Sequence, residues 1–103
     1  MRRSQLCETI AGNNCYLLQI TDFESDQEED GLKKGIILSA RVHPGETSNS
    51  YVMEGIIRFL TGQSENAKLL RQKFVFKIVP MLNIDGVVNG NYRCNLSGVD
   101  LNR

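Results

Sequence analysis

Apolar residues along the chain fall into short runs whose spacing alternates between that of strands and that of helices. Residues 7–22 (CETIAGNNCYLLQITD) predict two short strands around a Gly-Asn-Asn turn at 12–14. Residues 35–42 (GIILSARV) form a brief apolar run between a glycine and a Pro-Gly pair, which is typical of a buried strand. Residues 74–82 (FVFKIVPML) form a second run of this type.

Between these two strands the apolar spacing becomes helical. It predicts a helix from Glu46 to about Leu60 with Gly62 as a C-cap candidate, since apolar residues recur at helical spacing at Val52, Met53, Ile56, Ile57, Phe59 and Leu60. SENAKLLRQ predicts a second, shorter helix with Ser64 as its N-cap. The order strand, helix, strand predicts a right-handed crossover between parallel strands, and hence an α/β sheet.

Length and charge limit the size of the protein and its possible partners. The chain has 103 residues, enough for one small domain or a piece of a larger one, and twelve Lys and Arg balance twelve Asp and Glu. Nothing in this balance favours nucleic acid or a membrane surface as a partner. Residues 22–30 (DFESDQEED) hold six of the acids and are expected to form a solvated loop.

Three cysteines in no CxxC pair favour a reducing compartment. The basic N-terminus has no apolar segment behind it, and no stretch approaches the length of a membrane span. A cytoplasmic protein is therefore expected.

His43, the only histidine, directly follows the strand predicted at 35–42. In open α/β sheets ligands bind beyond the carboxyl ends of the strands, and Glu46 lies three residues further on. Imidazole and carboxylate groups at this spacing are able to converge on one zinc ion. From these two residues alone, however, a loop histidine and a favourable acid at a helix N-terminus are the simpler interpretation.

Residues 83–103 (NIDGVVNGNYRCNLSGVDLNR) are polar, carry little periodic apolar pattern, and indicate a functional loop region. Arg93 and Arg103, with Asn102 beside the second, supply planar donors suited to gripping a carboxylate. A solvated connection closed by side-chain turns is the alternative, and Asp85 is expected to be a turn residue in it.

Four ordered blocks, HPGE, PMLNIDGV, NYRC and GVDLNR, resemble the zinc metallocarboxypeptidases of the carboxypeptidase A type. The forms HPGE and NYRCNLSGVDLNR are most similar to the cytosolic carboxypeptidase subfamily, whose members remove glutamates from protein tails such as those of tubulin. The resemblance covers roughly residues 6–103. It implies an α/β fold with a mixed, largely parallel sheet and flanking helices, the phosphorylase/hydrolase-like carboxypeptidase fold.

The resemblance also implies roles for individual residues. His43 and Glu46 match two of the three protein ligands of the zinc ion. Arg93 matches the residue that polarises the scissile carbonyl, and Asn102 and Arg103 match those that bind the C-terminal carboxylate of the substrate. One further match, Asp100, corresponds to the acceptor that fixes the tautomer and orientation of the first zinc histidine.

The sequence departs from the family pattern because it ends at Arg103, before the family's third zinc ligand and its general-base glutamate. We therefore expect residues 1–103 to be the N-terminal portion of a catalytic domain, with little or no activity alone. The strands at 35–42 and 74–82 are each expected to lack a neighbour. Two alternatives stay open: a zinc acylase of related fold, and a non-catalytic module that binds carboxylates.

Overall fold

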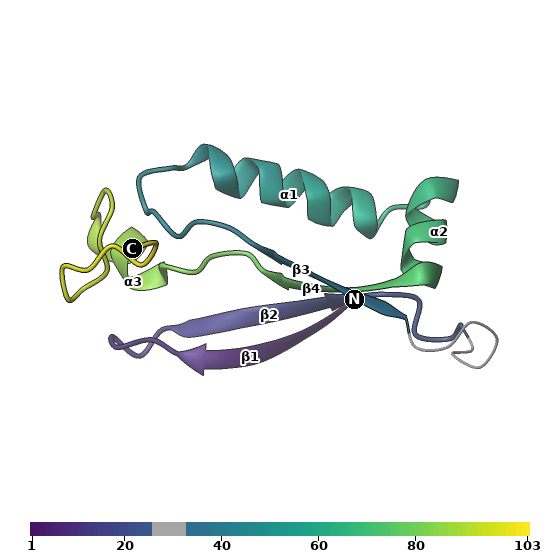
Figure 1. Ribbon diagram of the computed structural model, residues 1–103, viewed down its shortest axis with the longest axis horizontal. Helices are drawn as coiled ribbons and strands as arrows, with labels where there is room; N and C mark the ends of the chain where they lie inside the picture. The colour runs from purple at the N-terminus through teal and green to yellow at the C-terminus, as the bar shows by residue number, and fades with distance from the viewer. Residues whose placement is uncertain (26–32) are drawn as a thin grey trace.

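The computed structural model describes residues 1–25 and 33–103, so most of the acidic stretch at 22–30 lies outside the described residues. The elements follow one another in the order β1 (Arg2–Glu8), β2 (Asn14–Ile20), β3 (Lys34–Ser39), α1 (Ser48–Leu60), α2 (Glu65–Lys73), β4 (Phe74–Val79) and α3 (Ile84–Asn89), as Figure 1 shows.

The four strands form one mixed sheet in the order β1-β2-β4-β3. β2 pairs antiparallel with both β1 and β4, whereas β3 and β4 are parallel and joined through α1 and α2. The predicted parallel crossover and the mixed α/β class are thus confirmed. The expectation that the strands at 35–42 and 74–82 each lack a neighbour is wrong for β4, because β2 returns from the hairpin and pairs with its second edge.

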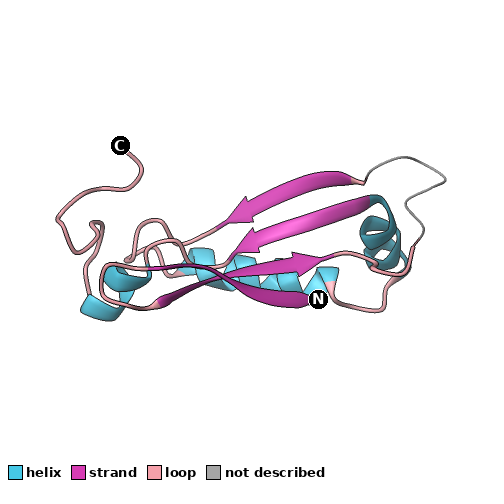
Figure 2. Ribbon diagram, turned by 90° about the horizontal axis from the view of Figure 1, so that it is seen from below, coloured by secondary structure: helices cyan, strands magenta, loops and turns pink. Residues whose placement is uncertain are grey.

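The core lies between the sheet and the two longer helices. In Figures 1 and 2, α1 and α2 lie on the same face of the sheet. The buried residues that pack together there are Ile20, Met53, Leu60, Phe76 and Ile78. Met53 and Leu60 are seven residues apart on α1, and Phe76 and Ile78 alternate along β4, so both sequence periods direct side chains into one layer.

β3 is less buried than its sequence predicts. It ends at Ser39, and Ile37 is 80% exposed, while Ile36 and Leu38 pack against the core. β3 pairs with β4 alone, and the helices cover one face of it, so alternate residues point to solvent. The prediction of a fully buried strand at 35–42 was therefore wrong.

The sequence predicted the starts of the two longer helices more accurately than the burial of β3. Ser64 caps α2, since its side chain accepts a hydrogen bond from the amide of Ala67 at 3.2 Å. α1 begins at Ser48, two residues later than expected. Among the residues that the structure describes, no helix is long and apolar enough to cross a membrane.

Asp85 has a different position from the one expected. It lies buried in the first turn of α3, and it accepts hydrogen bonds from the Thr9 hydroxyl at 2.5 Å, the Asn13 amide group at 2.8 Å and the Ala11 backbone at 3.0 Å. These bonds, that from Thr9 first, lower the pKa of Asp85. The prediction of a turn residue was wrong, because the side chain joins α3 to the β1–β2 turn.

Candidate active site

Two chain segments meet where β3 and β4 end. β3 leads into the loop that starts α1, and β4 leads towards α3, at the same end of the sheet (Figure 1). Backbone hydrogen bonds join the two exits, from Leu82 to Ala40 at 2.9 Å and from Asn83 to Arg41 at 3.1 Å. The carboxyl ends of parallel strands are the usual place for a ligand site in α/β sheets.

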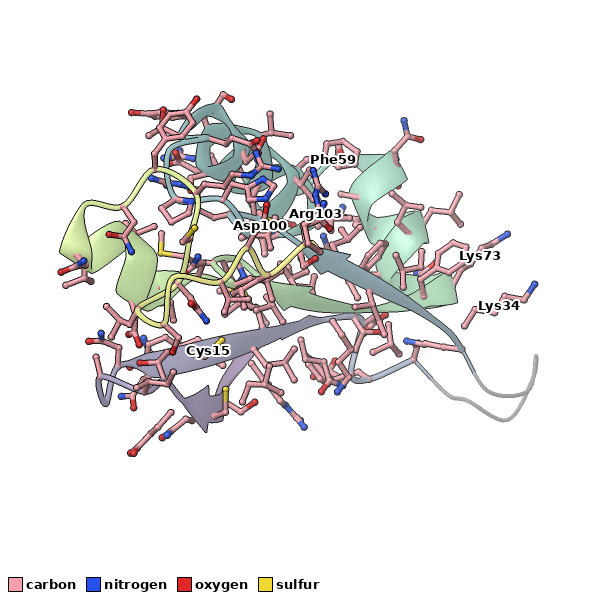
Figure 3. All side chains as sticks on the ribbon, turned by 60° about the vertical axis from the view of Figure 1, so that its left-hand side comes forward. Cys15, Lys34, Phe59, Lys73, Asp100 and Arg103 are labelled. Atoms are coloured by element: carbon pink, nitrogen blue, oxygen red, sulfur yellow. The ribbon has the colours of Figure 1, made fainter. Side chains whose placement is uncertain are left out.

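His43 is held between two carboxylates. Its side chain is buried, with Nδ1 3.2 Å from Oε1 of Glu46 and Nε2 2.9 Å from Oδ1 of Asp100. The amide of Glu46 donates to the carbonyl of His43 at 3.2 Å, which closes a tight turn and brings side chains three residues apart to the same side. Asp100 arrives from the C-terminal segment, which Figure 3 shows beside this loop.

Asp100 connects His43 with the arginine of NYRC. Its Oδ1 accepts from the backbone amide of Asn102 at 2.9 Å as well as facing His43, and its Oδ2 accepts from Nε of Arg93 at 2.6 Å. The amide of Asn102, then His43 and Arg93, hold the pKa of this carboxyl well below its usual range. Asp100 is therefore ionised and fixed by donors on both oxygens.

Arg93, expected to polarise the scissile carbonyl, and Asn102, expected to bind the substrate carboxylate beside Arg103, both contact Asp100. The side chain of Arg93 is 43% exposed, and its contact with Asp100 uses Nε and not the two terminal nitrogens. Asn102 and Arg103 are exposed directly after Asp100, and Nη1 of Arg103 donates to the carbonyl of Asn102 at 3.1 Å. Figure 3 shows Arg103 beside Asp100.

Arg41 contributes to the site although sequence reasoning did not select it. Its Nε donates to the carbonyl of Pro44 at 2.9 Å and its Nη1 to the hydroxyl of Ser50 at 2.7 Å, so it holds the loop around His43 against the start of α1. Arg41 has a φ of 60°, the left-handed region that costs an L-residue about 1–2 kcal/mol. No pattern in the sequence signals this conformation.

Two glycines allow the site segments to approach closely. A Cβ on Gly45 would overlap the ring of Tyr92, and the Gly45 amide donates to the Tyr92 carbonyl at 2.7 Å. A Cβ on Gly86 would lie 2.5 Å from the ring of Pro44. The glycines in HPGE and NIDG are sequence signals of such close approach. The sequence does not show which residues, Tyr92 and Pro44, they approach.

The donor chemistry of His43 and Glu46 fits a zinc ion. With Nε2 directed at Asp100, the Nδ1 atom remains and faces the Glu46 carboxylate, so a nitrogen and an oxygen donor converge. Within residues 1–25 and 33–103, no group of three His, Cys, Asp or Glu side chains is placed to hold a metal. The described chain therefore offers a pair of donors.

Comparisons with known proteins agree with this geometry. The family model described as zinc carboxypeptidase matches residues 1–103. Cytosolic carboxypeptidase 2 of Homo sapiens is 55% identical over 98 residues, which are 95% of this chain and 11% of that protein. Cytosolic carboxypeptidase 3 of Bos taurus is 56% identical over 98 residues, 95% of this chain and 10% of that protein. The chain thus spans about a tenth of the length of these curated relatives.

Solved structures show the same fold. A metallo-carboxypeptidase from Burkholderia cenocepacia is 34% identical with a TM-score of 0.88, over 99% of this chain and 27% of that one. The metallo-carboxypeptidase of Pseudomonas aeruginosa is 28% identical with a TM-score of 0.80, over 97% of this chain and 26% of that one. The predicted carboxypeptidase-type fold is confirmed.

Proposed function

The chain belongs to the zinc carboxypeptidase family, and from this premise we propose that residues 1–103 are the N-terminal portion of a catalytic domain that removes C-terminal residues from protein tails. The observation that carries the proposal is the Asp100 carboxylate, which contacts His43 through one oxygen and Arg93 through the other. A single ionised group thereby holds a metal donor and a carbonyl-polarising cation in one site.

His43 and Glu46 are proposed as two of the protein ligands of Zn²⁺. Nε2–H of His43 donates a hydrogen bond to Asp100, which leaves the lone pair of Nδ1 free on the side where the Glu46 carboxylate lies. When bound, zinc supplies a Lewis acid and makes a hydroxide nucleophile available at neutral pH.

Arg93, Asn102 and Arg103 are proposed to bind the substrate. The terminal nitrogens of Arg93 donate to the carbonyl oxygen of the scissile bond and stabilise the negative charge that develops there. Arg103 and Asn102 bind the terminal carboxylate, the former through the planar donors that match its geometry. Holding the chain end in this way places the last peptide bond over the metal donors and makes the enzyme an exopeptidase.

The proposed substrates are protein tails that end in glutamate, including those of tubulin, and the proposed location is the cytoplasm. The similarity to proteins named cytosolic carboxypeptidases supports the location and a substrate with a free C-terminus. The preference for glutamate is proposed from the resemblance of HPGE and NYRCNLSGVDLNR to the cytosolic carboxypeptidase subfamily.

The 103-residue chain alone is proposed to have little or no turnover. A catalytic zinc site normally has three protein ligands and an open position, whereas the described residues bring two donors together. Activity is therefore expected only when this chain stands within a longer domain.

A chimaera tests the proposal directly. Residues 1–103 would replace the matching 98-residue segment of human cytosolic carboxypeptidase 2, with zinc binding followed by calorimetry and hydrolysis followed on a peptide with a free C-terminal glutamate. We expect zinc binding that His43→Ala abolishes, cleavage of the free peptide, and no cleavage of the same peptide with an amidated C-terminus.

Matched variants separate the assigned roles. Arg103→Ala is expected to raise KM, while Arg58→Ala, which removes an exposed arginine from α1, leaves the kinetics unchanged. Zinc binding without cleavage of the free peptide would favour an acylase. A folded chimaera that binds glutamate tails but no zinc would favour the non-catalytic module.

A further inference from the structure

Two of the three cysteines face each other across the β1–β2 hairpin. Cys7 of β1 and Cys15 of β2 are directly opposite residues in the antiparallel register, next to an irregularity between Gln5 and Cys7. Both are free thiols, and Figure 3 shows Cys15 on β2. Directly opposite residues project to the same face of an antiparallel pair, so the two thiols are neighbours.

The backbone spacing suits a covalent link. Opposite residues in antiparallel strands have Cα atoms about 4.5–5.5 Å apart, and disulfides join residues with Cα atoms about 4.4–6.8 Å apart. The hairpin therefore presents Cys7 and Cys15 within the range that a disulfide requires, whereas Cys94 lies in the loop after α3.

The two thiols differ in access. Cys7 is exposed, whereas Cys15 is 4% exposed and its sulfur lies 3.8 Å from the carbonyl of Met81. Burial raises the pKa of the Cys15 thiol, and the neighbouring Cys7 raises it further. Cys7 is thus the thiol that a reagent in solution reaches first, and Cys15 is the one that follows.

We propose that Cys7 and Cys15 form a reversible, redox-sensitive disulfide in the folded chain, with a low-molecular-weight disulfide such as oxidised glutathione as the oxidant. The Cys7 thiolate attacks one glutathione sulfur, which forms a mixed disulfide and releases one glutathione thiolate. The Cys15 thiolate then attacks the sulfur of Cys7, which releases the second glutathione and closes the protein disulfide. Two protein thiols lose two protons and two electrons, and one glutathione disulfide becomes two thiols.

The link would lock the hairpin beside the turn that holds Asp85. Thr9, Ala11 and Asn13, the donors to Asp85, all lie between the two cysteines. In a reducing compartment such disulfides are usually transient and redox-sensing. The inference is independent of the proposed peptidase function.

The test equilibrates the chain in buffers of reduced and oxidised glutathione and measures its disulfide state by intact mass and peptide mapping. The same equilibration in urea gives the equilibrium constant for forming the Cys7–Cys15 disulfide in the unfolded chain. We expect a Cys7–Cys15 bond whose equilibrium constant is roughly tenfold or more higher in the folded chain, equivalent to about 1.4 kcal/mol. Equal constants in the two states, or a bond to Cys94, would overturn the proposal.

Serine variants make the assignment specific. Cys94→Ser is expected to keep the full oxidation response, and Cys7→Ser to lose it while circular dichroism shows an unchanged fold, because Cys7 is exposed. Oxidation of Cys94→Ser that stops at a glutathione adduct on Cys7 would contradict closure by Cys15.

Discussion

Replacement of Arg41 tests how the loop before His43 is held. The Arg41 side chain donates to the Pro44 carbonyl and to the Ser50 hydroxyl, and its backbone has a φ of 60°. Arg41→Ala removes both hydrogen bonds but retains the left-handed conformation. Arg41→Gly removes the same bonds and relieves the backbone, since glycine adopts positive φ readily.

The two variants are expected to differ by a predictable amount. Each lost hydrogen bond contributes about 1 kcal/mol net, so Arg41→Ala lowers the free energy of unfolding by about 2 kcal/mol. Glycine avoids the cost of the left-handed conformation, which is about 1–2 kcal/mol. The free energy of unfolding of Arg41→Gly is therefore expected to be about 1 kcal/mol or more higher than that of Arg41→Ala.

Urea denaturation followed by circular dichroism measures both free energies of unfolding. Arg58→Ala is the control, because Arg58 is exposed and its surface pair with Glu54 is worth less than about 1 kcal/mol. An Arg41→Gly variant no more stable than Arg41→Ala would refute the reasoning about the backbone. Full wild-type stability in both would show that the two hydrogen bonds do not hold the loop.

Three further predictions concern packing and pH. Ile78→Ala, at a fully buried position on β4, is expected to lower the free energy of unfolding by about 2–5 kcal/mol, while Ile37→Ala, 80% exposed on β3, changes it by less than about 0.5 kcal/mol; equal urea midpoints would contradict the assigned core. Because hydrogen bonds hold the pKa of Asp85 below its ordinary value, its stabilisation is fully present above the ordinary pKa and is lost as the pH falls through the lowered pKa of the folded state. The urea midpoint should therefore fall more steeply with acid in the wild type than in Asp85→Asn, and parallel curves would exclude this cause. Gly45→Ala is expected to cost about 1–3 kcal/mol through overlap with the Tyr92 ring, and Tyr92→Ala should restore part of the loss in the double variant, so simply additive losses would argue against that contact.

Local patterns predicted the elements because their signals are contained within each segment. The spacing of Met53 and Leu60 placed one face of α1 on the sheet, and Ser64 fixed the start of α2. The exposure of Ile37 depends on which strands and helices cover β3, which no short window contains. The role of Asp85 was missed for the same reason, since its partners lie more than seventy residues away.

The candidate site could be predicted in its residue types but not in its contacts. Ordered motifs selected His43, Glu46, Arg93 and Asp100 through a family resemblance. The sequence alone contained no signal that Nε of Arg93 contacts Asp100. It also gave none that Arg41 supports the loop, because a left-handed arginine has no sequence pattern.

Zinc titration of the ¹⁵N-labelled chain, followed by the imidazole nitrogen signals, tests whether His43 and Glu46 bind the metal, because His43 is the only histidine. We predict that Nε2 keeps its proton in a hydrogen bond to Asp100, that the Nδ1 signal shifts with zinc, and that Glu46→Gln weakens this shift. A zinc-dependent shift at Nε2, or a response at Nδ1 that Glu46→Gln leaves unchanged, would contradict the assignment of His43 and Glu46 as the metal donors.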